Sequence, residues 1–246
     1  MRMTTDGLIV REQFTGESTR IITVLTREHG LIRAFSPGAR SLKSKYVSST
    51  QLLCFSKLSL AESKGIYRVE SASPIDVFFE LRNDVVKLSL AQYFCELAMF
   101  FTPEEDDCTE LLRLLLNAIK FLEKEMHSPA KLKATVELRI LSLTGYLPDL
   151  VGCRDCANFS QDTYYFDPIA GTVQCEACAQ LSGTAGIRIS YAVFCAMRHI
   201  IYSEFQKIFS FKLSPAAELE LEQVSEEYLL AHAERNFTTL QFYHSL

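Results

Sequence analysis

Two Cys-x-x-Cys pairs are the residues whose type and spacing most clearly indicate chemistry. Cys153 and Cys156 form one pair, Cys175 and Cys178 form the other, and 18 residues lie between the pairs. Each pair can present two thiolates to one ion, and this spacing is typical of a four-thiolate zinc site. Because four thiolates leave no coordination position for water, we expect one structural Zn²⁺ per chain and no zinc catalysis.

Two other interpretations of these cysteines stay open: reduced thiols without a metal, and two redox-active pairs. The N-terminus lacks the pattern of a secretory signal, and no apolar run approaches the ~18 residues that span a bilayer. We therefore expect a reducing, cytoplasmic location, where a disulfide framework is not favoured. The remaining cysteines are predicted to be small buried hydrophobic residues: Cys54, Cys95, Cys108 and Cys195.

Positive charge is concentrated in the first third of the chain, although the formal net charge is −5. Residues 1–80 contain 11 Lys and Arg against 8 Asp and Glu, whereas residues 81–246 contain 14 against 22. Residues 29–61 include no acidic side chain. This asymmetry indicates an anionic partner for the first part of the chain only.

The basic stretch predicts a nucleic-acid site. The loop in "RAFSPGARSLKSKYVSST" and its neighbouring strands supply six expected nucleic-acid contacts: Arg11, Arg20, Arg33, Arg40, Lys43 and Lys45. Phe14, Phe35 and Tyr67 are candidate stacking surfaces, because nucleic-acid-binding barrels combine a cationic groove with aromatic platforms. The alternative is a solvated loop beside core aromatics. No base-reading helix is recognisable, which favours contacts to the nucleic-acid backbone.

The sequence shows no catalytic constellation. Its five histidines have no Ser, Asp or Cys partner at a suggestive spacing, and "GARSLKSK" lacks the pattern of a phosphate-binding loop. We therefore expect no enzymatic activity and assign no catalytic residue. The rival hypotheses are a zinc-dependent interaction scaffold without nucleic-acid contact and a thiol-dependent enzyme.

The elements that must position these residues change in kind near residue 80. Five segments with the alternation of β-strands precede it, which indicates a small barrel of the OB-fold type. Helical spacing follows, and Ser128 with Pro129 has the pattern of a helix start. We predict an α+β multidomain chain in which an N-terminal OB-fold β-barrel precedes an α-helical domain carrying a four-cysteine zinc module. The predicted ranges are 1–79 for the barrel, 80–150 and 181–246 for the helical domain, and 151–180 for the module.

Two long segments carry a resemblance to a known family. They are "GLIVREQFTGESTRIITVLTREHGLIRAFSPGARSLKSK" and "ELRILSLTGYLPDLVGCRDC", the latter followed by "YFDPIAGTVQCEAC". The first is similar to the opening barrel and basic loop of the RecO family of bacterial DNA repair and recombination mediators. The second is similar to that family's leucine-rich helix and four-cysteine module. In this order and spacing, the resemblance covers nearly the full chain.

The resemblance implies binding of single- and double-stranded DNA and annealing of complementary strands. It also implies that the protein works with RecR to load RecA onto DNA covered by single-stranded DNA-binding protein, whose acidic C-terminal tail it contacts. As candidate contacts for this tail we name Lys131, Lys133 and Arg139, which share one predicted helix. The C-terminus "ERNFTTLQFYHSL" departs from the family because it is poor in basic residues, which speaks against a DNA contact there.

Overall fold

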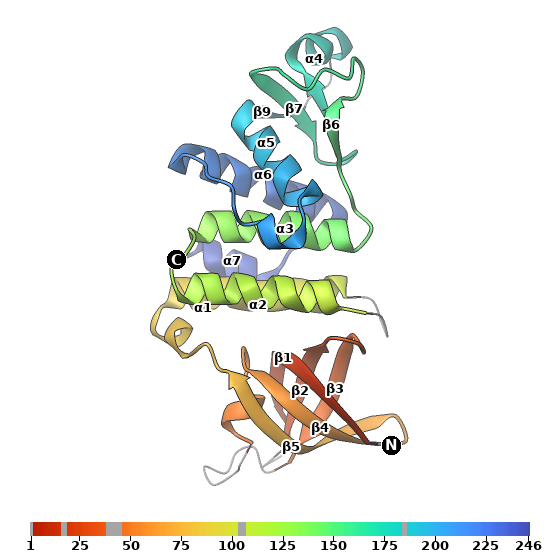
Figure 1. The fold of residues 1–246 in the computed structure, drawn as a ribbon, viewed down its shortest axis with the longest axis vertical. Helices are drawn as coiled ribbons and strands as arrows, with labels where there is room; N and C mark the ends of the chain where they lie inside the picture. Colours follow the sequence, from red (N-terminus) through yellow and green to blue (C-terminus); the bar gives the residue numbers. More distant parts are fainter. Residues whose placement is uncertain (1, 16–18, 38–45, 103–106, 184–185) are drawn as a thin grey trace. The chain divides into compact units, whose positions relative to one another are not determined.

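The computed structural model describes residues 2–15, 19–37, 46–102, 107–183 and 186–246, which divide into two units (Figure 1). The first unit comprises residues 1–126 and 237–246, and the second comprises residues 127–236. The sequence-based division instead groups all helices after residue 80 into one domain. The structure divides them differently because the last helix returns to pack on the first one.

A closed barrel of five strands forms the start of the first unit, as the sequence predicts. The strands are β1 Arg2–Thr15, β2 Thr19–Thr26, β3 Leu31–Ser36, β4 Phe55–Ser63 and β5 Ile66–Asp76. Their order around the barrel is β1-β2-β3-β5-β4, and every neighbouring pair is antiparallel except β3 and β5. This is the five-stranded Greek-key arrangement of an OB-fold.

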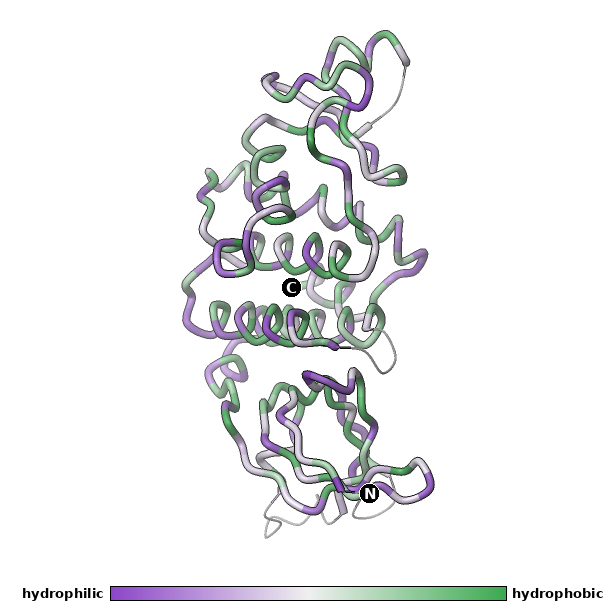
Figure 2. Tube along the Cα trace, turned by 45° about the vertical axis from the view of Figure 1, so that its right-hand side comes forward, coloured by the Kyte–Doolittle hydropathy of each residue, from purple (hydrophilic) through white to green (hydrophobic). Residues whose placement is uncertain are grey.

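Residue hydropathy alternates along the barrel strands (Figure 2). The reason is that one face of each strand fills the barrel and the other faces outward. The interior cluster is made of Ile9, Ile22, Val24, Ile32, Ala34, Cys54, Leu58, Leu60 and Val69. Gly7 permits a close approach of β1 to β2, since a Cβ at this position would lie 2.4 Å from Val24 Cγ1 and 3.0 Å from the Leu25 carbonyl oxygen.

Three helices complete the first unit: α1 Val85–Phe101, α2 Thr109–Glu123 and α7 Thr238–His244. The Asp84 side chain caps α1 by accepting hydrogen bonds from the backbone N–H groups of Val86 and Lys87. The Glu96 carboxylate of α1 accepts hydrogen bonds from Thr239 N at 3.0 Å and Thr239 Oγ1 at 2.6 Å. Glu96 thereby binds the start of α7, a helix that the sequence patterns do not predict.

The second unit combines helices with a small sheet. Its helices are α3 Pro129–Leu143, α4 Glu176–Ser182, α5 Tyr191–Tyr202 and α6 Pro215–Ala233. Its strands are β6 Asp149–Cys153, β7 Thr163–Asp167, β8 Thr172–Cys175 and β9 Ile187–Ser190, in the order β6-β8-β7-β9. Ser128 caps α3 and Pro129 occupies its first turn, as predicted. Ser190 and Ser214 cap α5 and α6 in the same way.

Short 3₁₀ turns connect several of these elements: η1 Ser48–Thr50, η2 Phe79–Asn83 and η3 Phe205–Lys207. In the module, β7 and β8 form an antiparallel hairpin between the cysteine pairs. The Asp167 carboxylate accepts hydrogen bonds from Ile169 N and Ala170 N at its turn, and Gly171 follows with φ 64°. Gly171 suits this left-handed position because it has no Cβ.

A buried ion cluster joins α3 to α6. Lys133 is fully buried, and its Nζ lies 2.9 Å from Glu137 Oε1 and 2.7 Å from Glu226 Oε2. Ser225 Oγ donates a hydrogen bond to Glu137 Oε2 at 2.6 Å. Burial works against the charged form of Lys133, but the two carboxylates raise its pKa above the ordinary value. The ammonium therefore stabilises the α3–α6 contact only while its carboxylate partners are present.

Substituting Lys133 by Met leaves Glu137 and Glu226 facing each other without a cation. We expect the variant to lose about 3–5 kcal/mol of unfolding free energy, because a buried charge without its partner is costly. Urea unfolding followed by circular dichroism measures this. The control is Lys207→Met, which removes an exposed ion pair with Glu204 and should change stability by less than about 0.5 kcal/mol. Equal stability of the two variants would contradict the prediction.

Candidate nucleic-acid interface and metal centre

The four predicted zinc ligands converge in the second unit. The sulfur atoms of Cys153, Cys156, Cys175 and Cys178 all lie within 4.8 Å of one another, and Cys156 Sγ is 3.7 Å from Cys175 Sγ. A Zn–S bond of about 2.3 Å places the sulfurs of a tetrahedral site about 3.8 Å apart. Among the described residues, this is the only group of three or more His, Cys, Asp or Glu side chains arranged to hold a metal ion. The donor set and its spacing fit a four-thiolate metal site.

Local backbone structure positions these thiols. Cys153 ends β6 and Cys175 ends β8, and the two strands run parallel side by side. The turn after Cys153 closes through Ala157 N to Cys153 O at 2.8 Å, and Ala157 takes φ 58°. Burial opposes ionisation of Cys153, but backbone N–H groups of Cys175 and Cys156 point at its sulfur and help to lower its pKa to about 6. Cys153 therefore has the thiolate character that a metal requires.

The remaining cysteines divide into two groups. Cys54, Cys95 and Cys108 are buried, as predicted. Burial raises the pKa of the Cys95 thiol to about 12, which makes it chemically inert. The prediction for Cys195 is wrong, because this residue lies on the solvent-facing side of α5 and is exposed. The spacing of apolar residues along α5 did not show whether Cys195 lies on the buried or on the solvent-facing side of the helix.

Three arginines share the outer surface of the barrel. In the strand register, Arg11 of β1 pairs with Thr23 of β2, which pairs with Arg33 of β3. The next row joins Gln13, Ile21, Phe35 and Arg68 across β1, β2, β3 and β5. Directly paired residues point to the same face of a sheet. We call these seven residues the arginine face.

The arginine face has the charge pattern of a phosphate-binding surface. It contains three arginines and no carboxylate. All three arginines are exposed, and none of them forms an ion pair with another described residue. Phe35, which is 38% exposed, lies beside Arg68. Cations next to an exposed aromatic ring suit a nucleic-acid strand, whose phosphates and bases need different partners.

The structure distributes the six predicted DNA contacts unevenly. Arg11 and Arg33 lie together on the arginine face, whereas Arg40, Lys43 and Lys45 lie outside the described residues. Arg20 is only 4% exposed and forms an ion pair with Glu12, so its predicted phosphate contact is not supported. The reason is its position on the inner side of β2.

The three predicted stacking residues also differ in their exposure to solvent. Phe14 is 50% exposed and Phe35 is 38% exposed, whereas Tyr67 packs against the barrel core. Tyr67 pairs with Ala34, an interior residue, and so faces inward. Arg68, its neighbour, was missed by the sequence reasoning. Its strand is apparent from the alternation, but its place beside Phe35 depends on a parallel pairing between segments far apart in the chain.

Comparison with known proteins identifies the family to which this chain belongs. Residues 1–78 match the family model for the N-terminal part of recombination protein O, and residues 82–241 match the model for its C-terminal part. This chain belongs to the RecO family. A DNA repair protein RecO from Acetivibrio thermocellus is 34% identical over 98% of this chain and 96% of its own.

Two further relatives extend this similarity within bacteria. A DNA repair protein RecO from Dehalococcoides mccartyi is 33% identical over 89% of this chain and 85% of its own. One from Alkaliphilus metalliredigens is 26% identical over 98% of each chain. The match therefore spans the barrel, the helices and the cysteine module of this RecO family member.

The lysines and arginine expected to contact an acidic tail have internal partners in this RecO family member. Lys133 is buried in the ion cluster described above, so its predicted contact with a partner is contradicted by its burial. Lys131 Nζ donates to the Phe211 carbonyl oxygen at 2.6 Å and lies 4.5 Å from the Phe211 ring centre. Arg139 Nη1 donates to the Ile201 carbonyl oxygen at 2.8 Å. All three side chains stabilise the second unit itself.

A groove of ≈ 350 Å³ lies nearby on α5. Ala192, Cys195 and Ala196 line it from the helix, and Phe211, Lys212 and Leu213 line it from the segment before α6. Tyr191 and His199 complete the lining. The Nε2–H group of His199 donates to the Lys207 carbonyl oxygen at 2.7 Å, which holds the segment before α6 close to α5. The groove is mainly apolar, with the exposed Lys212 as its cation.

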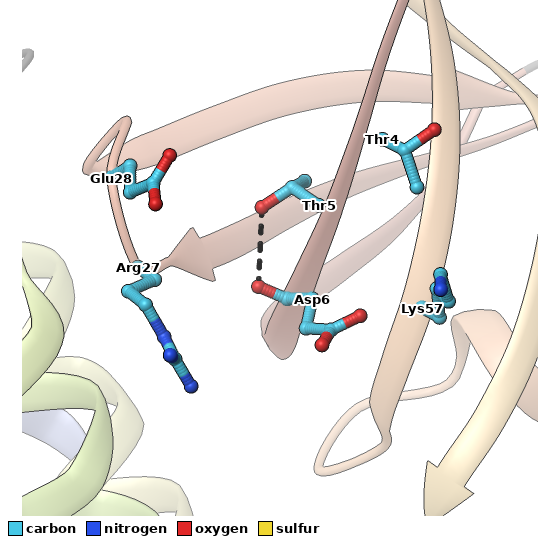
Figure 3. A pocket seen from close by; sticks show the side chains of 6 residues that line it. All are labelled: Thr4, Thr5, Asp6, Arg27, Glu28 and Lys57. Atoms are coloured by element: carbon cyan, nitrogen blue, oxygen red, sulfur yellow. Dashed lines mark hydrogen bonds between the residues drawn. The ribbon is translucent and has the colours of Figure 1, made fainter.

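A second pocket, of ≈ 270 Å³, lies on the barrel. Thr4, Thr5 and Asp6 of β1, Lys57 of β4, and Arg27 with Glu28 after β2 line it (Figure 3). Figure 3 shows the Asp6 carboxylate between Arg27 and Lys57. Two cations and two carboxylates leave this pocket without net charge, so it lacks the electrostatic character of the arginine face.

In the described part of the chain, no helix combines the length and the apolar character that crossing a membrane requires.

Replacing Cys178 by Ser removes one of the four metal-facing thiols. We expect the wild-type protein to bind one metal ion per chain and the variant to bind none, because structural sites of this kind need all four ligands. Metal analysis of the purified protein by plasma mass spectrometry measures the stoichiometry. Cys195→Ser is the matched control, since Cys195 is exposed outside the cluster, and it should keep one ion per chain. An unchanged metal content in Cys178→Ser would show that these cysteines do not form the site.

Proposed function

We propose that this chain is a recombination mediator that binds DNA and anneals complementary strands without catalysing a chemical reaction. The observation that supports the proposal is the arginine face, on which Arg11, Arg33 and Arg68 lie without a carboxylate among them. Membership of the RecO family and the OB-fold barrel agree with it. The barrel then serves as the DNA-binding part of the molecule.

The proposed mechanism is electrostatic. Guanidinium groups bind phosphate oxygens through two parallel hydrogen bonds, so the arginines hold the sugar-phosphate backbone of a strand. Phe35 and Ile21 offer apolar surface to a base or sugar beside them. Contacts of this kind leave the Watson–Crick edges of the bases free, and a second strand can pair with them. Because phosphate contacts are common to both DNA forms, the same surface serves single- and double-stranded DNA.

We infer that the four cysteines hold Zn²⁺, which supplies structural cross-linking rather than catalysis. The ligand set consists of four thiols, and zinc is the metal that such sites most commonly select. The cysteines belong to β6, the turn after it, β8 and α4, so one ion connects four successive parts of the module. Metal binding therefore contributes to folding of the module.

In this proposal the chain acts with RecR to load RecA onto DNA covered by single-stranded DNA-binding protein. It does so in the bacterial cytoplasm, at the nucleoid. The acidic C-terminal tail of single-stranded DNA-binding protein docks in the groove on α5, in place of the α3 residues named from the sequence. An apolar terminal side chain fits against Ala192 and Ala196, and Lys212 attracts the carboxylates.

Substituting Arg11, Arg33 and Arg68 together by Ala should weaken binding of single-stranded DNA and reduce its salt dependence. Each phosphate contact contributes roughly −0.7 to the slope of log K against log salt, so three lost contacts should flatten the slope by about 2. Fluorescence anisotropy with a labelled oligothymidylate across a salt series measures both quantities.

The control for this triple variant is Lys57→Ala, because Lys57 is an exposed cation of the same barrel on β4. Its salt slope should equal that of the wild type. An unchanged slope in the triple variant would remove the arginine face as the DNA site. A wild-type protein that binds no DNA at all would instead favour the zinc-stabilised scaffold.

Reversing the charge of Lys212 to Glu should weaken binding of a peptide that has an acidic, apolar C-terminal end. We expect roughly a tenfold loss of affinity, because a like charge replaces the attracting one at the rim of the groove. Isothermal titration calorimetry with the synthetic peptide measures this. Arg188→Glu, an exposed cation on β9, is the control and should bind normally. Equal affinity in the two variants would exclude this groove.

A further inference from the structure

Arg20 is a buried cation of the barrel that the proposed DNA contacts do not use. It is 4% exposed, and its Nη1 lies 3.2 Å from Glu12 Oε2. The same nitrogen is 3.3 Å from both the Val47 carbonyl oxygen and Thr50 Oγ1. The guanidinium carbon lies 5.0 Å from the centre of the Phe14 ring. One side chain thus connects β1 and β2 to residues 47–50.

Residues 46–50 complete the barrel where strand pairing ends. The parallel register of β3 and β5 contains only two pairs, Ala34 with Tyr67 and Phe35 with Arg68. Beyond them, the Tyr46 hydroxyl donates to the Glu70 carbonyl oxygen at 2.8 Å and Ser49 Oγ donates to the Ala72 carbonyl oxygen at 3.4 Å. These side chains bond to carbonyl groups of β5 that have no partner on β3.

Arg20 therefore acts on β5 through residues 46–50. Thr50 Oγ1 is bonded to Arg20 and also donates to the Tyr46 carbonyl oxygen at 2.7 Å. Tyr46 in turn is bonded to β5 two residues beyond Arg68. The contacts form a continuous chain from Glu12 through Arg20 and Thr50 to the strand that carries the third arginine of the arginine face.

We propose that Arg20 is a positioning residue for DNA binding: it holds residues 46–50 against β5 and so fixes Arg68 and Phe35 relative to Arg11 and Arg33. The inference rests on the proposed DNA-binding role of the arginine face. Arg20 itself does not contact DNA, because its guanidinium is buried and paired with Glu12. Glu12, although acidic, supports DNA binding in this arrangement.

The direction in which DNA affinity changes when the Glu12 charge is removed distinguishes a positioning role of Arg20 from direct contact between Arg20 and DNA. If Arg20 bound phosphate directly, removing the Glu12 charge would release the guanidinium and strengthen DNA binding. If Arg20 positions the β5 side of the face, removing Glu12 leaves a buried guanidinium without its carboxylate, and residues 46–50 lose their anchor. DNA binding then weakens, although the protein has become less negative.

The experiment compares Glu12→Gln and Thr50→Val with the wild type in the full chain, using labelled oligothymidylate across a salt series. Each variant should bind roughly fivefold more weakly, the change expected from one lost hydrogen bond. Each should also flatten the salt slope by roughly 0.7, because Arg68 leaves its phosphate. Thr50→Val changes no charge, so a change in its salt slope cannot come from the substituted side chain and must come from the altered position of Arg68. Amide hydrogen exchange should rise in residues 46–50 and 66–72.

Two controls and a stability check accompany these variants. Glu28→Gln removes the same charge from an exposed position of the barrel, and Thr4→Val makes the Thr50 substitution at an exposed site. Both should bind DNA like the wild type. Thermal melts confirm that all variants are folded at the assay temperature, since a general loss of stability lowers the active fraction without altering the salt slope.

The outcomes distinguish this inference from the proposed function. If the triple arginine variant weakens binding but Glu12→Gln and Thr50→Val bind like the wild type, the arginine face stands and the positioning role is overturned. Stronger binding by Glu12→Gln overturns it as well, in favour of direct contact. If the triple arginine variant itself binds like the wild type, the arginine face is not the DNA site. The positioning role of Arg20 in DNA binding is then excluded as well.

Discussion

Backbone pairing between β3 and β5 stops after two residue pairs, and side chains complete the barrel there. Carbonyl groups at a strand edge can accept hydrogen bonds from side chains where no strand pairs with them. Tyr46 and Ser49 donate such hydrogen bonds to β5, and Arg20 holds their segment in place. The outer surface of the barrel keeps its arrangement only while this closure holds. The spacing of the three arginines on the arginine face thus depends on the contacts that Arg20, Tyr46 and Ser49 make.

Cations in this chain divide into two classes that composition does not separate. Arg20 and Lys133 are buried beside carboxylates and connect elements to each other, whereas Arg11, Arg33 and Arg68 face solvent. A charge without a partner is costly inside a protein, so every buried cation needs an acidic or carbonyl partner nearby. No carboxylate of a described residue pairs with Arg11, Arg33 or Arg68, and a phosphate is the ligand that fits such guanidinium groups best. The distinction between structural and functional cations therefore follows from their partners.

The cysteine module shows the same dependence of local geometry on contacts between segments. Cys153 and Cys175 end neighbouring parallel strands, and this adjacency brings two sequence pairs into one cluster. The small sheet buries apolar side chains, among them Tyr164, Phe166 and Val173, and a metal ion held by the four thiols would add cross-links to this core. The module then stabilises the second unit, and the barrel of the first unit carries the proposed DNA surface.

The sequence by itself determined those features that depend on neighbours along the chain. Strand alternation indicated the five-stranded barrel, Ser128 with Pro129 indicated the start of α3, and the two Cys-x-x-Cys pairs indicated the metal site. Only the tertiary structure decided which cations are exposed, where Cys195 lies, and that Arg68 stands beside Phe35. These outcomes depend on pairing between β3 and β5 and on packing of α3 against α6, which join residues far apart in sequence. Alternation specifies which residues share a face, but the identity of the neighbouring strand or helix decides what each side chain meets.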